Sequence, residues 1–380
     1  MKSLVLVEKK HIELMEKEVP VITAPHGVLL EPVLVSPCTS DVHTIWQGSP
    51  KRKNLTLGHE CAARVVETGA EVKDFRKGDL VAVPAITPDW SQEDAAANPG
   101  HAGTNFSGHM LGKSIDGAFQ EMFYLPYAER NLAHIPEGVS LSQALMCADV
   151  VTTGFTACEE AGVGKGDTVV VMGIGAIGLA AVMGAFYYGA ARVFAVGSRP
   201  ENVRIAEALG AEVINYKTCT AKLPEGMHPL ANSTGSPVVN YVLSETGTKG
   251  ADAVLLCGGD DRSLPQAVDM CRYGTGTVSS VMYYGASENV PEGEIDGIVI
   301  PKFSIGRGMA GKTLRFSLAK GGRARMEELL SLCAEGKIHP EVLISKEYEG
   351  YEMLVQAIYD MRDRKAVKIA VRLSPEERVL

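Results

Sequence analysis

A glycine-spaced turn between two apolar runs narrows the possible folds of this chain more than any other feature. Thr168–Met172 is typical of a buried strand, Gly173–Gly178 follows with the spacing G-x-G-x-x-G, and an alanine-rich helix start comes next. In such a turn the first glycine permits the bend, the second lets a pyrophosphate approach the backbone, and the third allows close helix packing. The free N–H groups of the helix attract phosphate. The predicted cofactor-binding residues of this turn are Gly173, Gly175, Ala176, Ile177 and Gly178.

This spacing alone also occurs in ordinary glycine-rich turns, so its context decides. Strand-like and helix-like runs alternate after Thr152, which predicts a doubly wound parallel sheet of the Rossmann type. The expected strands are Thr168–Met172, Arg192–Val196, Ala253–Leu256 and Gly276–Val281, and the expected helices are Ile177–Tyr188 and Glu201–Leu209. Thr218–Gly250 interrupts the alternation with Pro, Gly, Ser and Thr, and we expect a surface excursion there.

The rest of the chain has a different pattern. Short valine-rich runs separated by turns predict a mainly β domain before residue 152. The expected strands are Val28–Val35, Cys61–Glu67, Asp79–Val83 and Phe119–Leu125, followed near the end by helices at Arg325–Ala334 and Tyr351–Arg362 and a strand at Val367–Leu373. A chain of 380 residues is long enough for two domains.

Composition excludes several classes of function. Lys and Arg total 37 and Asp and Glu total 46, a net charge of −9, so the chain has no general electrostatic reason to bind nucleic acid or an anionic membrane. No apolar run reaches the ~18 residues of a membrane span, and Glu8–Lys10 cuts short the only apolar run near the start, which argues against a signal peptide. The eight cysteines are scattered without a C-x-x-C pair, so we expect reduced thiols and a cytoplasmic location.

The end of the second strand indicates which dinucleotide binds. An NAD-specific enzyme needs a carboxylate there to accept hydrogen bonds from the ribose 2′-hydroxyl. This chain has Gly197, Ser198 and Arg199 instead. Gly197 leaves space, Ser198 can donate a hydrogen bond, and Arg199 can pair with a 2′-phosphate, which predicts NADP. The alternative is that Arg199 simply faces solvent.

Four side chains of metal-ligand type stand in three separate segments. A catalytic zinc takes three protein ligands and keeps one open position. Cys38 offers a thiolate, His59 an imidazole and Asp149 a carboxylate, and Glu60 is either an exchangeable fourth ligand or a partner of the other ligands. Each also has a simpler interpretation: Cys38 as a core thiol, His59 as a buried structural histidine, and Asp149 as a helix cap.

Taken together, these motifs resemble the medium-chain, zinc-dependent alcohol dehydrogenase family, and most closely its NADP-dependent secondary alcohol branch. Gly58-His59-Glu60, Cys38 followed by Ser40 and His43, and the glycine turn carry the resemblance, which extends over nearly the whole chain except Thr218–Gly250. It implies a mainly β, GroES-like catalytic domain at 1–152 and 316–380, and an NADP-binding Rossmann domain at 153–315. Asp149 stands where other members of the family place a second thiolate.

The resemblance also assigns roles to individual residues. It implies that Ser40 contacts the substrate oxygen and that His43 is the outer end of a proton relay. It implies that Thr153 packs on the nicotinamide and that Tyr216 flanks the 2′-phosphate. Substrate-side residues would be Ala85, Ile86 and Tyr283.

The stretch where many relatives hold a structural zinc, roughly Ser91–Ser114, contains no cysteine. His101 and His109 lie there, but lone loop histidines usually face solvent, so we expect one catalytic zinc per chain and no structural zinc. The implied reaction is reversible hydride transfer between a small secondary alcohol, such as 2-propanol, and NADP, by a homotetramer. The alternatives are a zinc-dependent polyol or sugar-alcohol dehydrogenase and a non-catalytic nucleotide-binding protein on the same fold.

Overall fold

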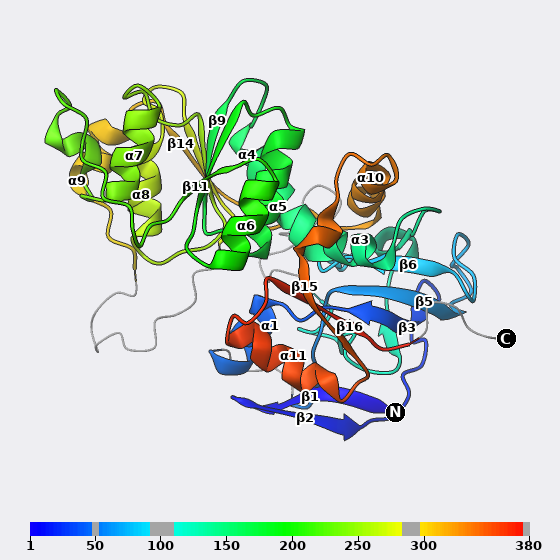
Figure 1. The fold of residues 1–380 in the computed structure, drawn as a ribbon. Helices are drawn as coiled ribbons and strands as arrows, with labels where there is room; N and C mark the ends of the chain where they lie inside the picture. Colours follow the sequence, from blue (N-terminus) through cyan, green and yellow to red (C-terminus); the bar gives the residue numbers. More distant parts are fainter. Residues whose placement is uncertain (48–52, 92–109, 283–296, 375–380) are drawn as a thin grey trace. The chain divides into compact units, whose positions relative to one another are not determined.

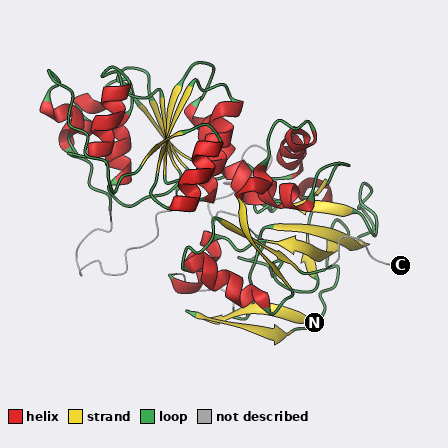
Figure 2. Ribbon diagram, viewed as in Figure 1, coloured by secondary structure: helices red, strands yellow, loops and turns green. Residues whose placement is uncertain are grey.

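The alternating runs after residue 152 form a parallel sheet in the computed structural model, which describes residues 1–47, 53–91, 110–282 and 297–374. The chain divides into two units, residues 1–152 with 319–380, and residues 153–318. The first unit contains two sheets and the second unit one, and each unit has its own helices (Figures 1 and 2). Within the described ranges, no helix has both the length and the apolar character that a membrane span requires.

The sheet of the second unit has six strands in the order β11-β10-β9-β12-β13-β14, all parallel. This is the order 3-2-1-4-5-6 of a dinucleotide-binding fold, which confirms the predicted doubly wound architecture. The strands are β9 (Thr168–Met172), β10 (Arg192–Val196), β11 (Glu212–Ile214), β12 (Ala253–Leu256), β13 (Thr277–Ser280) and β14 (Thr313–Phe316).

Helices cover both faces of this sheet, with α5 and α6 on one side and α7 and α8 on the other (Figure 1). The helices of this unit are α4 (which begins at the boundary, Thr152–Ala161), α5 (Ala176–Tyr187), α6 (Pro200–Ala208), α7 (Pro237–Glu245), α8 (Ser263–Met270) and α9 (Lys302–Ile305), with single 3₁₀ turns at Pro229–Asn232 and Arg307–Met309.

The expectation that Thr218–Gly250 is a surface excursion is wrong for part of that segment. Residues 237–245 form α7, whose Val238, Val239, Val242 and Leu243 are buried in the core of the second unit. Helix periodicity is present over these nine residues, but the Pro-, Gly- and Ser-rich flanks hide it in a longer window.

The first unit is mainly β, as predicted. Its larger sheet has the order β15-β16-β3-β5-β6-β8, with β7 also paired to β3, and a smaller sheet has the order β2-β1-β4. The strands are β1 (Lys2–Glu8), β2 (His11–Glu16), β3 (Val28–Val35), β4 (Leu55–Thr56), β5 (Cys61–Thr68), β6 (Leu80–Val83), β7 (Phe123–Leu125), β8 (Ala133–His134), β15 (Ile344–Glu349) and β16 (Lys368–Arg372). The strand predicted at Phe119–Leu125 is shorter, because only its last residues pair regularly with β3.

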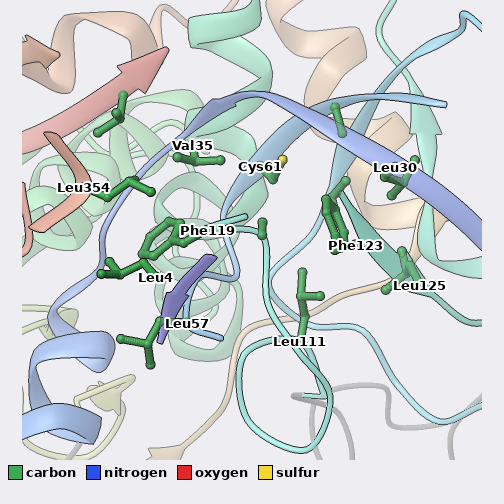
Figure 3. Close-up of a cluster of buried hydrophobic side chains, with 14 of the residues drawn as sticks. Leu4, Leu30, Val35, Leu57, Cys61, Leu111, Phe119, Phe123, Leu125 and Leu354 are labelled. Atoms are coloured by element: carbon green, nitrogen blue, oxygen red, sulfur yellow. The ribbon is translucent and has the colours of Figure 1, made fainter. Parts of the chain in front are cut away.

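The helices of the first unit are α1 (Thr39–Trp46), α2 (Ala128–Asn131), α3 (Leu141–Met146), α10 (Arg323–Ala334) and α11 (Met353–Arg362), with a π-helical turn at Cys147–Val151 and a 3₁₀ turn at Pro340–Leu343. Its core gathers large apolar side chains from the strands of both sheets and from the loop before β7 (Figure 3). Phe119 lies in the middle of this cluster and is fully buried, and the loop that carries Gly58 packs directly on it.

Candidate active site

Cys38 stands at the start of α1 and is held there by a capping box. Its backbone N–H donates to Asp41 Oδ2 at 2.9 Å, and its Sγ lies 3.5 Å from the Ser40 backbone N–H. Such reciprocal bonds satisfy N–H groups that a helix start leaves open. They also hold the thiol in place just after β3, where Cys38 is 8% exposed.

The Gly58-His59-Glu60 motif depends on the conformation of its glycine. Gly58 has φ +97°, in the left-handed region, and a Cβ at this position would lie 2.4 Å from Phe119 Cδ1. A residue with a side chain would be strained by its backbone and would clash with the core. Glycine therefore allows the turn that places His59 and Glu60, both buried, immediately before β5.

Asp149 belongs to a π-helical turn between α3 and α4. It lies inside the turn Cys147–Val151, so the structure does not support the simpler interpretation as a helix cap. A π turn inserts one residue into a helix, and such insertions are frequent at functional sites. The turn is attached to the β domain through the Ala85 N–H, which donates to Ala148 O at 2.9 Å.

These three segments bring four ligand-type side chains together. One ligand atom from each of Cys38, His59, Glu60 and Asp149 lies within 4.8 Å of those of the other three. Cys38 Sγ is 3.3 Å from Asp149 Oδ2, and His59 Nε2 is 3.9 Å from the same oxygen. Ligands of a tetrahedral zinc lie roughly 3.3–3.8 Å apart, since zinc–ligand bonds are about 2.0–2.3 Å long. The spacing therefore fits a zinc ion.

Asp41 orients the imidazole of His59. Asp41 Oδ1 lies 3.3 Å from His59 Nδ1, and both side chains are almost fully buried. Burial opposes the charged form of the carboxylate, but the nearby imidazole and the Cys38 N–H outweigh it and lower the pKa of Asp41 to about 2. An ionised Asp41 keeps the proton on Nδ1, which leaves Nε2 as the atom that can bind a metal.

Two further groups in the cluster respond to burial. Burial, together with the charges of Asp149 and Asp41, raises the pKa of the Cys38 thiol to about 11. A bound cation reverses this preference, because zinc binds the thiolate. Lys368, fully buried at the start of β16, places Nζ 2.5 Å from Glu60 Oε1. Burial disfavours its charge, but Glu60, Cys38 and Asp149 together outweigh burial and raise the pKa of this ammonium.

Glu60 has one carboxylate oxygen available to a metal. Oε1 accepts from Lys368, whereas Oε2 is buried and has no hydrogen-bond partner in the described part of the chain. A buried carboxylate oxygen without a partner is costly. A cation among the four ligand atoms would satisfy it, and the S, N and O donor set is one that zinc accepts. The residues present therefore fit a zinc ion, with Glu60 able to act as a ligand.

Two of the predicted catalytic and substrate-side residues, Ser40 and Ala85, contact segments that carry this cluster. Ser40 Oγ is 3.1 Å from His59 Nε2, so the hydroxyl borders the candidate metal position. His43 follows one turn later on α1 and is half-buried, with Nδ1 2.8 Å from Gln47 Oε1. Ala85 and Ile86 are buried, and the Ala85 N–H binds the turn that carries Asp149. Tyr283, His101 and His109 lie outside the described residues.

The glycine turn of the second unit has the shape expected for a phosphate site. Gly173 has φ +82°, and a Cβ on Gly178 would lie 2.1 Å from Gly173 O, so both positions require glycine. A Cβ on Gly175 would find no atom closer than Arg199 Nη2, at 3.8 Å. Ala176 and Ile177 begin α5. The backbone is open at the helix start, and the cationic side chain of Arg199 lies beside it, which fits a dinucleotide.

The end of β10 is closely packed. Gly197 is buried, and a Cβ there would lie 2.1 Å from Ile174 Cγ1. The Ile174 side chain thus fills the space where an acidic side chain would begin, and Asn202 Nδ2 donates to Ile174 O at 2.6 Å. Ser198 and Arg199 are half-buried, Tyr216 is exposed and Thr153 is buried at the start of α4.

Sequence reasoning missed four residues that shape these sites: Asp41, Lys368, Ile174 and Asn202. The acid three residues after Cys38 is the signal of a capping box, and it could have identified Asp41. Lys368 directly precedes the apolar run Ile369–Val371 of β16, and a lysine at such a buried position indicates a buried partner. No comparable pattern in the sequence indicates the contacts that Ile174 and Asn202 make.

Comparison with known proteins supports this view of both units. Residues 24–137 match the family model of the alcohol dehydrogenase GroES-like domain, and residues 176–335 match that of the zinc-binding dehydrogenases. The chain is 37% identical to the NADP-dependent isopropanol dehydrogenase of Thermoanaerobacter brockii, over 96% of this chain and 97% of that protein. It is 38% identical to the enzyme of the same name from Entamoeba histolytica, over 98% and 96%.

Among solved structures, alcohol dehydrogenase TADH from Thermus sp. ATN1 superposes with a TM-score of 0.81 at 26% identity, covering 98% of this chain and 100% of that one. The predicted resemblance and fold class are confirmed by these matches. The chain belongs to the zinc-binding alcohol dehydrogenase family of oxidoreductases.

Proposed function

We propose that this protein catalyses reversible hydride transfer between a small secondary alcohol and NADP, using one zinc ion per chain. The observation that carries the proposal is the convergence of Cys38, His59, Glu60 and Asp149 within 4.8 Å of one another. Three segments far apart in the sequence supply these groups. Membership in a zinc-binding dehydrogenase family supports the view that they come together to bind a metal. The naming of the two relatives as NADP-dependent isopropanol dehydrogenases supports the substrate and the cofactor.

Cys38, His59 and Asp149 would hold the zinc, and Glu60 would exchange between the metal and Lys368. When bound, zinc supplies Lewis-acid chemistry that lowers the pKa of an alcohol oxygen, and the nicotinamide accepts the hydride. Asp41 keeps His59 in the tautomer that binds metal through Nε2. Lys368 neutralises part of the negative charge that these ligands concentrate in a buried place.

Ser40 and His43 would move the proton that the alcohol loses. The Ser40 hydroxyl borders the metal position, 3.1 Å from His59 Nε2, so it can accept a hydrogen bond from a substrate hydroxyl. His43, three residues further along α1, is on the same side of the helix. Histidine is a common proton shuttle in proteins, which suits it to this place.

In the second unit, Gly173, Gly175, Ala176, Ile177 and Gly178 would bind the pyrophosphate of NADP. Gly197, Ser198, Arg199 and Tyr216 would surround the 2′-phosphate, and Thr153 would contact the nicotinamide. The Arg199 guanidinium beside the open face of Gly175 supports this assignment. Phosphate binding by a planar guanidinium is strong because two N–H groups can donate in parallel.

Ala85, Ile86 and Tyr283 would line the substrate pocket, where a small side chain at 85 leaves space for the second carbon substituent of a ketone. We further propose a homotetramer located in the cytoplasm, with no structural zinc. Sedimentation of the purified protein checks the assembly: a mass of four chains supports it, and a monomer contradicts it.

The activity assay compares substrates and cofactors with the purified protein. We expect 2-propanol to reduce NADP⁺ with a kcat/KM well above the values for ethanol and for sorbitol, and acetone to be reduced by NADPH. A preference for sorbitol would favour the polyol alternative. Absence of any alcohol-dependent NADP⁺ reduction in zinc-loaded protein would contradict the proposal.

Cofactor choice gives a prediction at single-residue level. Arg199→Ala should weaken NADP⁺ binding by about 10- to 100-fold, because a charge-assisted hydrogen bond contributes roughly 1.5–3 kcal/mol and each 1.4 kcal/mol is tenfold. NAD⁺ binding should change little. Calorimetry measures both dissociation constants. The control is Arg204→Ala, which changes an exposed arginine on α6, the helix that Arg199 precedes. Equal weakening of both cofactors by Arg199→Ala would mean that the 2′-phosphate binds elsewhere.

The packing of Ile174 changes how this preference can be reversed. Gly197→Asp alone would force its Cβ against Ile174 Cγ1, so we expect it to weaken NADP⁺ and NAD⁺ alike. Adding Ile174→Ala and Arg199→Ala makes space and removes the phosphate partner, and this triple variant should prefer NAD⁺. If Gly197→Asp with Arg199→Ala prefers NAD⁺ equally well without the change at 174, Ile174 is not an obstacle.

A further inference from the structure

The π turn that carries Asp149 must be held in place for Asp149 to reach the other ligands. A π turn contains one residue more than an α-helical turn, and one residue of an α-helix corresponds to about 100° of rotation. Relaxation of Cys147–Val151 into regular α-helix would therefore turn the Asp149 side chain away from Cys38 and His59. The Thr152 N–H closes the turn by donating to Asp149 O.

Helix α10 contacts both ends of this turn, within the first unit. At one end, Arg325 Nε lies 3.1 Å from Thr152 Oγ1, and that hydroxyl donates to Lys320 O at 2.8 Å. At the other end, Cys333 Sγ lies 3.7 Å from Cys147 Sγ. The ligand Asp149 stands between the two contacts. The segment just before α10 also reaches the substrate side, since the Gly322 N–H donates to Ile86 O.

Arg325 is a costly residue in this position. Its side chain is only 6% exposed, whereas Glu328, which forms an ion pair with it, is 55% exposed. Removing a guanidinium from water is unfavourable unless its N–H groups are used. Here Nη1 donates to Glu328 Oε2 at 2.8 Å while Nε faces the hydroxyl of Thr152. The three nitrogens of the guanidinium reach both the helix and the end of the π turn, whereas a lysine would donate from a single atom.

We propose that Arg325 and Thr152 form a positioning pair that keeps Asp149 in the metal-binding register. Neither residue belongs to the candidate ligand set, so we expect both to act through the π turn. The inference rests on the proposed zinc site. It adds that tight zinc binding requires Arg325 and Thr152 as well as the four ligand residues. Groups outside the ligand shell commonly change metal affinity by about 10- to 100-fold.

The test measures zinc affinity directly. Apo protein is titrated with zinc in competition with a chromophoric chelator, for the wild type, Arg325→Met, Arg325→Lys and Thr152→Val. We expect about 10- to 100-fold weaker zinc binding in Arg325→Met and Thr152→Val, with a smaller loss in Arg325→Lys. A double variant that combines Arg325→Met with Thr152→Val should lose less zinc affinity than the product of the two single losses. The reason is that the two residues act through the same contact.

The matched control is Arg323→Met, on the same helix. Arg323 pairs with Asp74, Glu129 and Glu327 near the surface and does not touch the π turn. It should lower thermal stability without changing zinc affinity. The visible spectrum of Co²⁺-substituted protein gives a second readout: a changed ligand field in Arg325→Met but not in Arg323→Met supports the proposal.

Three outcomes would overturn it. The first is that both Arg325→Met and Thr152→Val keep the zinc affinity and the Co²⁺ spectrum of the wild type. This result would show that the π turn keeps its conformation without the contact to α10. An equal loss of zinc affinity in Arg323→Met would assign the effect to general stability. Wild-type protein without zinc affinity would contradict the proposed function and this inference together, whereas the first two outcomes leave the proposed function intact.

Discussion

Asp149→Ala is expected to abolish alcohol-dependent turnover and to lower zinc content to a small fraction of the wild-type value. The reason is the geometry of the cluster: Asp149 Oδ2 lies 3.3 Å from Cys38 Sγ and 3.9 Å from His59 Nε2, so its removal takes away a proposed ligand that no other described side chain replaces. NADPH binding should be nearly unchanged, because the residues proposed to bind the nucleotide belong to the second unit. Elemental analysis, turnover and NADPH fluorescence measure the three properties.

Asp149→Cys is the matched variant. It rebuilds the set of two thiolates and one imidazole that zinc uses in other alcohol dehydrogenases, so we expect zinc to be retained. Activity should be partly retained as well. If Asp149→Ala keeps both its zinc and its full turnover, the carboxylate is not a metal ligand.

Ser40→Ala should reduce turnover by about 10²- to 10⁴-fold, the usual contribution of a positioned proton-transfer group. The structure gives the reason, since Ser40 Oγ borders the candidate metal position at 3.1 Å from His59 Nε2. Zinc content and NADPH affinity should remain at wild-type values. The measurement is kcat for 2-propanol oxidation and for acetone reduction.

Two variants sharpen this prediction. Ser40→Thr keeps a hydroxyl and should retain much of the activity. His43→Ala should cost less than Ser40→Ala, because His43 is partly accessible and water can take its place. Wild-type turnover of Ser40→Ala in both directions would remove Ser40 from the mechanism.

Local patterns in the sequence were sufficient to predict the doubly wound sheet. The apolar runs at 168–172, 192–196 and 253–256 coincide with β9, β10 and β12, because buried parallel strands are continuously apolar. Helix α7 was missed because its flanks are rich in turn-forming residues. The segment around α1 was also not predicted as a helix, although Cys38 and Asp41 carry its capping box.

The candidate site was predictable only in part. The ligand-type residues stand in recognisable short motifs, and a family resemblance connects them, since spacing alone cannot bring position 38 next to position 149. The supporting residues are different in kind. Lys368 and Arg325 act through contacts with Glu60 and Thr152, more than 150 residues away along the chain, and no local pattern encodes such pairs.

Zinc content measured together with activity tests the central claim, that Cys38, His59, Glu60 and Asp149 hold the single metal ion on which the reaction depends. Elemental analysis should give about one zinc per chain, as expected for one site with an open position. Removal by a chelator should abolish 2-propanol-dependent NADP⁺ reduction, and one equivalent of zinc should restore it. Full activity in zinc-free protein would contradict the account, and a reproducible content near two would show a second site that the account lacks.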